Sequence, residues 1–171
     1  MKKSFLISNL IILYFIFIFQ VSWVYAQDQS KNLVNQTNLI DLGLAYFRLG
    51  MFQEAVEKLE KGLELDNSNK VGWKSLAAAY KAQGLYSQAE ETYQLTLKLD
   101  DKDPRVWFEI GNLYLDKQDY QSAIESYNKS ITLEASQPDV YYNLGNVYYE
   151  LENYEKARDV YFQALAIDPH Y

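Results

Sequence analysis

Few residues in this chain are of the types that carry out chemistry. His170 is the only histidine and there is no cysteine, so the chain lacks the base of a typical nucleophilic triad and the typical ligands of zinc. Carboxylates are plentiful, as at Glu90 and Glu91, but acidic residues on helix faces and in loops are ordinarily solvated charge. The seven glycines are scattered and form no phosphate-binding loop. We therefore expect a protein that is not an enzyme, with no catalytic residues, no metal site and no cofactor.

The charge balance bears on the class of partner. The chain has 23 acidic and 16 basic residues, which gives a formal net charge of −7. An acidic surface repels a phosphate backbone, so we expect no nucleic-acid partner. The class of ligand that the chain does bind depends on which elements present its side chains.

An internal repeat sets those elements. A tyrosine, a small residue, an alanine and an aromatic ring each recur four times at one constant spacing. The columns are Tyr46, Tyr80, Tyr114 and Tyr148; Gly43, Ala77, Gly111 and Gly145; Ala55, Ala89, Ala123 and Ala157; and Phe52, Tyr86, Tyr120 and Tyr154. The copies span residues 36–69, 70–103, 104–137 and 138–171 without insertions. A stack of such units buries its core between neighbours and presents a long surface.

Each copy contains two runs of apolar residues at helical spacing, separated by a short break. The first run of the third copy, for example, includes Trp107, Ile110 and Tyr114. Pro104 and Pro138 open two of the copies and suit the first position of a helix. No segment has the alternation expected of a strand. We predict an all-α fold, a right-handed α-solenoid of four 34-residue helix-turn-helix repeats.

This pattern resembles that of the tetratricopeptide repeat (TPR) family, whose signature is Trp, Leu-Gly and Tyr, followed by Ala, an aromatic residue and Pro. The matching residues are Trp73, Leu76, Ala77, Tyr80, Ala89 and Tyr93 in the second copy; Trp107, Ile110, Gly111, Tyr114, Ala123 and Tyr127 in the third; and Tyr141, Leu144, Gly145, Tyr148, Ala157, Tyr161 and Pro169 in the fourth. The first copy departs most, with Leu39, Leu59 and Asn67 at the Trp, aromatic and Pro positions. The resemblance covers residues 36–171. It is specific for the fold but not for the function, because the signature residues belong to the core.

The resemblance implies that a protein or peptide ligand lies along a concave face lined by the first helix of each unit. The candidate binding residues lie on these helices outside the core stripe: Lys74, Arg105, Phe108, Asn112, Tyr142, Asn143, Asn146 and Tyr149. We expect Phe108, Tyr142 and Tyr149 to form a row of solvent-facing rings. Such rings supply apolar anchors, and the amides beside them pair with a peptide backbone. The alternative is that the rings only cover the helix surface, as scattered exposed apolar residues do.

One ligand class of the family is not expected. Some members hold a C-terminal carboxylate with Lys and Asn in one unit, Asn in the next, and Lys and Arg in a third. In this chain Lys74 matches, but Ala78, Glu109, Asp139 and Asn143 stand at the other four positions. Two acidic residues in that set oppose a carboxylate.

The N-terminal segment, residues 1–26, differs from the repeats. Lys2 and Lys3 precede an apolar stretch over residues 5–19, and Val24-Tyr25-Ala26 follows, which are the three parts of a secretory signal peptide. The alternative is an uncleaved N-terminal membrane anchor, since residues 5–24 are just long enough to span a bilayer. Polar residues 27–35 are interpreted as a linker. We therefore expect an exported protein, periplasmic or extracellular, or alternatively a membrane-anchored one.

Together these observations predict a secreted or periplasmic TPR scaffold or adaptor. The alternatives are a membrane-anchored envelope assembly factor and a regulatory subunit of an envelope enzyme. The fourth copy carries a further expectation, because no following helix in this sequence covers Tyr148, Val160, Tyr161, Ala164, Leu165 and Ile167. We expect association at this C-terminal repeat, as a homodimer or with a capping partner.

Overall fold

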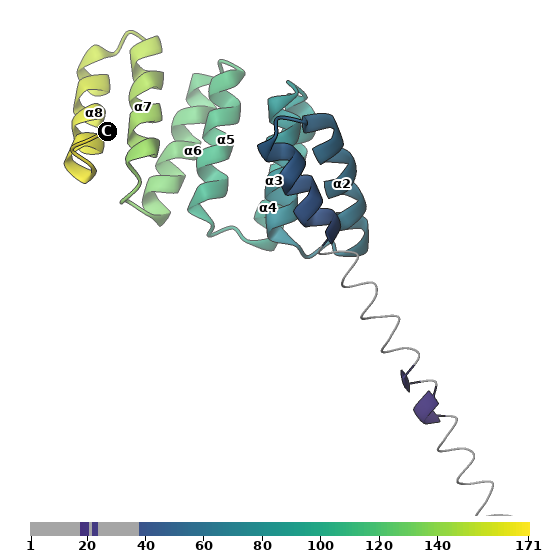
Figure 1. The fold of residues 1–171 in the computed structure, drawn as a ribbon. Coiled ribbons are helices and arrows are strands. Elements are labelled where there is room, and N and C mark those ends of the chain that lie inside the picture. Colours follow the sequence, from purple (N-terminus) through teal and green to yellow (C-terminus); the bar gives the residue numbers. More distant parts are fainter. Residues whose placement is uncertain (1–17, 21, 24–37) are drawn as a thin grey trace, which may run out of the picture.

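The computed structural model describes residues 18–20, 22–23 and 38–171, and this part of the chain is helical with no strand. Residues 38–48 form a helix that precedes the labelled elements of Figure 1. The further helices are α2 (Phe52–Leu65), α3 (Lys70–Ala82), α4 (Tyr86–Leu99), α5 (Pro104–Asp116), α6 (Tyr120–Leu133), α7 (Pro138–Glu150) and α8 (Tyr154–Ile167). Consecutive helices form antiparallel pairs that stack side by side from α2 to α8 (Figure 1).

The order of contacts along the stack is that of a solenoid. Within the units, α3 packs on α4, α5 on α6 and α7 on α8. Between units, α2 packs on α3, α4 on α5 and α6 on α7, and the first helices α3, α5 and α7 also contact one another in sequence. The expected all-α solenoid is confirmed. Because neighbouring first helices touch, their side chains form one continuous surface.

Each pair turns at a residue with a positive φ angle, and this position also recurs with the period of the repeat. It is occupied by Gly50 (φ 74°), Gly84 (φ 73°), Gln118 (φ 59°) and Glu152 (φ 57°). Glycine adopts this left-handed conformation without steric cost. In Gln118 and Glu152 the Cβ atom crowds the backbone, so the same conformation is disfavoured there. The turn geometry is therefore fixed by the packing of the helices as well as by the local sequence.

Four of the labelled helices begin at a residue whose side chain caps the first turn. The side chains of Asn69, Asp103, Asp119 and Asn153 accept a hydrogen bond from a backbone N–H in the first turn of α3, α5, α6 and α8. Pro104 and Pro138 occupy the first turns of α5 and α7, as predicted.

The core depends on small residues where the two helices of a unit cross. Ala55, Ala89, Ala123 and Ala157 are at most 2% exposed. A Cβ atom added at Gly145 would lie 2.5 Å from the ring of Tyr161, and one added at Gly111 would meet the ring of Tyr127 in the same way. The tyrosine ring therefore lies directly against the backbone of the first helix, which only a residue without a side chain permits.

The N-terminal predictions lie largely outside the described residues. The signal peptide or anchor at 1–26 includes only residues 18–20 and 22–23 of the described part, and the linker at 27–35 includes none of it. No helix within the described ranges has the length and apolar character needed to cross a bilayer. Export and anchoring both stay predictions.

Overpacking should reveal how tightly the helices cross. Ala123→Leu adds three carbons at a fully buried position between α6 and its neighbours, so we expect a loss of about 1–3 kcal/mol or more in the free energy of unfolding. Chemical denaturation followed by circular dichroism measures this loss. Ala166→Leu, at an exposed position of α8, is the matched control and should change little. Equal stability of the two variants would contradict the packing described here.

Candidate ligand-binding face

The surface shared by α3, α5 and α7 brings the predicted binding residues together. We call it the first-helix face and define it by residues that project from these helices outside the core. They are Lys74, Lys81, Arg105, Phe108, Glu109, Asn112, Tyr142, Asn143, Asn146 and Tyr149. All eight predicted residues belong to this set. Lys81 and Glu109 are added because their side chains bridge α3 and α5.

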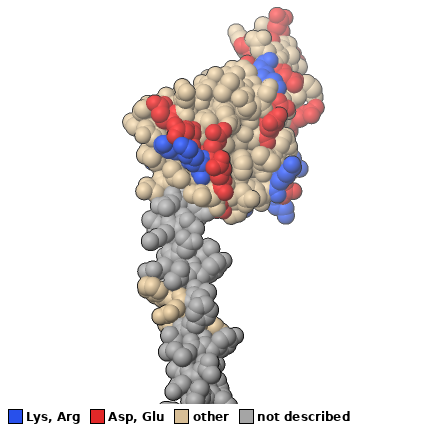
Figure 2. Space-filling model, turned by 90° about the vertical axis from the view of Figure 1, so that its right-hand side faces the viewer, with Lys and Arg blue, Asp and Glu red and all other residues tan. Residues whose placement is uncertain are grey.

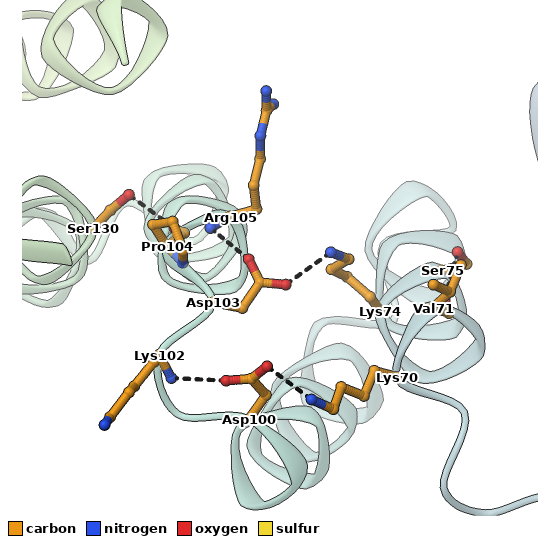
Figure 3. A network of polar contacts seen from close by, with 10 residues as sticks. All are labelled: Lys70, Val71, Lys74, Ser75, Asp100, Lys102, Asp103, Pro104, Arg105 and Ser130. Atoms are coloured by element: carbon orange, nitrogen blue, oxygen red, sulfur yellow. Dashed lines mark hydrogen bonds and ion pairs between the residues drawn. The ribbon is translucent and has the colours of Figure 1, made fainter. Parts of the chain in front are cut away.

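The half of this face between α3 and α5 is held by ion pairs. Lys74 Nζ lies 2.8 Å from Asp103 Oδ2, and Lys81 Nζ lies 2.9 Å from Glu109 Oε2. Lys74 is therefore already paired within the protein, and its role in ligand binding stays a prediction. Its partner Asp103 also caps α5 by accepting the Arg105 backbone N–H (Figure 3).

A third ion pair and the side chain of Arg105 complete this region. Lys70 Nζ lies 2.9 Å from Asp100 Oδ2, and this hydrogen bond holds the pKa of Asp100 below its usual value. The side chain of Arg105 points away from the network in Figure 3 and makes no ion pair with any described residue. Arg105 is thus the cation of the predicted set that stays available to a ligand.

The half of the face between α5 and α7 is held by amides instead. Asn112 Oδ1 accepts two hydrogen bonds of 2.8 Å, one from the Tyr127 hydroxyl and one from Asn143 Nδ2. Asn146 Oδ1 accepts the Tyr161 hydroxyl at 2.7 Å. The predicted amides are therefore partly used within the protein. Asn143 Oδ1 and Asn146 Nδ2 make no hydrogen bond within the described part and remain available to a peptide backbone.

The three predicted rings differ in exposure. Tyr142 is 43% exposed and Tyr149 is 56% exposed, as expected for anchors in solvent. Phe108 is half-buried instead, with its ring centroid 6.0 Å from that of Tyr127, so the expected row of three solvent-facing rings is wrong at this position. The reason is that the Tyr127 ring fills the space above Gly111 and reaches the side of α5 on which Phe108 lies.

One residue of this site was missed from the sequence. Tyr171 packs on Tyr142 with ring centroids 5.4 Å apart, and burial together with the carboxylate of Asp139 raises the pKa of Tyr171 to about 12. A signal was present, because the separation of Tyr142 and Tyr171 along the chain equals that of Lys74 and Asp103. The two pairs occupy the same two positions of the repeat.

The charges on other surfaces are mixed. On the side of the molecule seen in Figure 2, acidic and basic side chains lie next to one another in small groups between uncharged areas. No group of three or more His, Cys, Asp or Glu residues gathers at metal-binding distance in the described ranges. What the arrangement supports chemically is contact with another chain through rings, amides and a few charges.

A buried hydroxyl distinguishes the second unit from the third and fourth. Tyr93, Tyr127 and Tyr161 occupy one column, and the corresponding residues of the first helices are Ala78, Asn112 and Asn146. Where asparagine is present, its side-chain oxygen accepts a hydrogen bond from the tyrosine hydroxyl. Tyr93 faces no such amide, and its hydroxyl has no hydrogen-bond partner among the described residues. Burial raises the pKa of Tyr93 above its usual value.

Comparisons with known proteins agree with this architecture. A family model described as tetratricopeptide repeat matches residues 46–107, a second of that description matches residues 138–171, and one described as TPR repeat matches residues 111–152. None of the curated proteins matches the chain in sequence.

Solved structures with the same fold include MamA and PilF. A crystal structure of MamA is 23% identical over 80% of each chain, with a TM-score of 0.74. PilF of Pseudomonas aeruginosa is 24% identical over 82% of this chain and 64% of its own, with a TM-score of 0.73. MamA from Desulfovibrio magneticus RS-1, from residue 41 to its end, is 18% identical over 79% and 76%, with a TM-score of 0.73. At these identities the likeness shows the fold alone.

The Tyr93 hydroxyl gives a matched test of the asparagine–tyrosine contacts. Tyr127→Phe removes a hydrogen bond to Asn112 and should lower the free energy of unfolding by about 1 kcal/mol. Tyr93→Phe removes a buried hydroxyl without a partner and should be neutral or stabilising. Urea denaturation of both variants measures the difference. In a protein that carries Ala78→Asn, Tyr93→Phe should lower the free energy of unfolding, because the new asparagine can accept the hydroxyl. Equal effects of Tyr127→Phe and Tyr93→Phe in the original protein would contradict the asparagine–tyrosine contacts described here.

Proposed function

Because the chain belongs to the tetratricopeptide repeat family, we propose that it is an exported scaffold or adaptor that binds a protein or peptide on its first-helix face. Repeats of this family support a role in protein interaction, and they are generally not catalytic. The observation that carries the proposal is the group formed by Tyr142 and Tyr149 with Asn143 and Asn146. It joins two exposed rings to two amides that each keep one unused hydrogen-bonding atom.

The chemistry of this group suits a peptide main chain. The rings offer apolar area at low cost in side-chain entropy, since each has only two torsion angles to fix. Asn143 Oδ1 accepts and Asn146 Nδ2 donates, so together they match the N–H and C=O groups of an extended or helical segment. Arg105 lies in the first turn of α5 and makes no ion pair with a described residue, so it is a further contact for an acidic group of the ligand.

Export is proposed from the sequence of residues 1–26, with a location in the periplasm or outside the cell. Its support is the order of Lys2-Lys3, an apolar stretch and Val24-Tyr25-Ala26. The two alternatives are a membrane-anchored assembly factor and a regulatory subunit of an envelope enzyme. An N-terminus at Gln27 in protein isolated from the producing cells would support cleavage, whereas one at Met1 or Lys2 would support the anchor.

The contact at the C-terminal repeat is proposed on a revised set of residues. Tyr148 and Val160 pack against the core cluster around Leu144, and Ala164 is buried, so these three do not form the expected open face. Leu165 and Ile167 of the expected set are exposed, as are two residues outside it, Tyr154 and Phe162. Tyr154, Phe162 and Leu165 line a pocket of about 340 Å³ together with Tyr149, Ala157, Arg158 and Tyr161.

In the earlier repeats, the residue that corresponds to Leu165 packs against the following unit. Leu97, Ile131 and Leu165 occupy one column of the repeat, and the first two are packed against core clusters that include residues of the following unit. Leu165 is 40% exposed, and Phe162 beside it is 62% exposed. We propose that a second copy of the chain covers this face, since an apolar face rimmed by a charged residue such as Arg158 is typical of an interface.

Binding through the first-helix face is tested by removing its rings. Tyr142→Ala combined with Tyr149→Ala should weaken partner capture from an envelope extract of the producing cells by about 1–3 kcal/mol per ring. The melting temperature should change little, because both rings are exposed. Leu95→Ala, at an exposed position of α4, is the control and should not affect capture. Unchanged capture by the double variant would show that the partner binds at another surface.

Association through α8 is tested by sedimentation of residues 27–171 at micromolar concentration. We expect a dimer that dissociates when Phe162 and Leu165 are both replaced by serine, because the apolar area that drives the contact is then lost. Helical content by circular dichroism controls for folding. A monomer at all concentrations, unaffected by the two substitutions, would contradict the proposed contact.

A further inference from the structure

A pocket of about 400 Å³ opens where the first-helix face meets the ends of α5 and α7. On one side it is lined by Asp116, Gln118 and Tyr120, which belong to the end of α5, the turn and the start of α6. On the other side it is lined by Asn146, Tyr149 and Glu150, which belong to the last turns of α7. The pocket therefore joins two residues of the proposed binding site to residues that the sequence analysis did not assign.

The charges of this pocket have one sign. Asp116 and Glu150 are exposed carboxylates that form no ion pair among the described residues, and the lining contains no Lys, Arg or His. Asp116 is the last residue of α5 and Glu150 the last of α7. The C-terminal ends of two helices, each with a negative partial charge, thus lie beside two carboxylates. Such a site favours a cation and opposes an anion.

The lysine nearest in sequence is already engaged elsewhere. Lys117 follows Asp116, but its Nζ lies 2.6 Å from Glu90 Oε2 on α4. This hydrogen bond holds the pKa of Glu90 below its usual value. The carboxylates of the pocket therefore have no neutralising partner from the residue next to them.

The engaged lysine also shows how this fold holds an ammonium group. Lys117 Nζ lies 5.2 Å from the centre of the Tyr114 ring while it pairs with Glu90, and the Tyr114 hydroxyl donates to Glu90 Oε1 at 2.8 Å. One carboxylate and one tyrosine ring together hold the cation. The pocket between α5 and α7 presents these same two group types, twice over, with Asp116, Glu150, Tyr120 and Tyr149.

We propose that this pocket binds a lysine side chain of the ligand that occupies the first-helix face. The carboxylates pair with the ammonium group, and the rings of Tyr149 and Tyr120 pack on its methylene chain. The free Nδ2 of Asn146, on the same wall, donates to a carbonyl of the ligand backbone next to that lysine. This inference rests on the proposed function and adds the charge of the ligand, which the net charge of −7 also favours.

The test uses a fluorescent eight-residue peptide of alternating lysine and serine, with its Nε-acetylated form as a neutral comparison. We expect the full chain to bind the lysine peptide at low salt and the acetylated peptide far more weakly, as measured by fluorescence anisotropy. Asp116→Asn combined with Glu150→Gln should lower the affinity for the lysine peptide by about tenfold or more, because two charged contacts are lost. Both residues are exposed, so folding should be preserved, and circular dichroism checks this.

A matched control separates a site from general attraction. Glu64→Gln combined with Glu91→Gln removes the same amount of charge from exposed positions of α2 and α4, and should change the affinity less than about twofold. Equal losses in the two double variants, or none in either, would overturn the lysine site.

The same variants distinguish this inference from the proposed function. If the Asp116 and Glu150 substitutions leave lysine-peptide binding unchanged while Tyr142→Ala and Tyr149→Ala abolish partner capture, the first-helix face binds a partner and the lysine site is wrong. If capture also survives the ring substitutions, the proposed function itself fails at this face.

Discussion

The packing of a tyrosine ring on a glycine backbone is the contact on which the rest of this structure depends. A Cβ atom at Gly111 or Gly145 would collide with the ring of Tyr127 or Tyr161, so the helices of these units approach only because the side chain is absent. The close approach carries each hydroxyl across to the first helix, where Asn112 or Asn146 accepts it. The side-chain oxygen of Asn112 also accepts a hydrogen bond from the side-chain amide of Asn143 in the next unit. One chain of contacts thus runs from the core of a unit to the surface that neighbouring units share, and a change at the glycine would disturb both.

The second unit reaches the same geometry by other means. Ala77 replaces the glycine, and Ala78 replaces the asparagine, which leaves the Tyr93 hydroxyl without a partner. The first helices of the second and third units are linked by ion pairs in place of an amide pair, Lys81 with Glu109 and Lys74 with Asp103. Ion pairs at partly exposed positions contribute little to stability, so this joint depends mainly on the apolar cluster of Tyr93, Val106 and Ile110 beneath it. The solenoid is uniform in its backbone but not in the polar contacts that connect its units.

Much of the fold follows from the sequence because each column of the repeat places one residue type in one environment. The tyrosine, alanine and glycine columns, and the helix starts at Pro104 and Pro138, identify helix pairs before any coordinates are known. The exposure of single side chains does not follow in the same way. Phe108 is half-buried because the Tyr127 ring reaches it across α5, and the bond from Asn143 to Asn112 depends on the rotation between successive units. That rotation results from the summed packing of whole helices, which no short spacing in the sequence records. The constant spacing between each asparagine and its tyrosine was, by contrast, readable from the columns.

The polar contacts between units make the two halves of the binding face unequal. Between α3 and α5, a ligand would have to displace or desolvate the pairs of Lys74 with Asp103 and Lys81 with Glu109, and an ion pair broken on one side leaves a charge without its partner. Between α5 and α7, the corresponding positions carry amides with spare hydrogen-bonding atoms and rings already in solvent. In the column of the repeat that begins with Lys81 in the second unit, Leu115 and then Tyr149 follow, so the cation is lost in the third and fourth units. Asp116 and Glu150 have no ion-pair partner among the described residues, because Lys117 is engaged by Glu90. The α5–α7 half is therefore the part of the face where a cationic ligand meets the least competition.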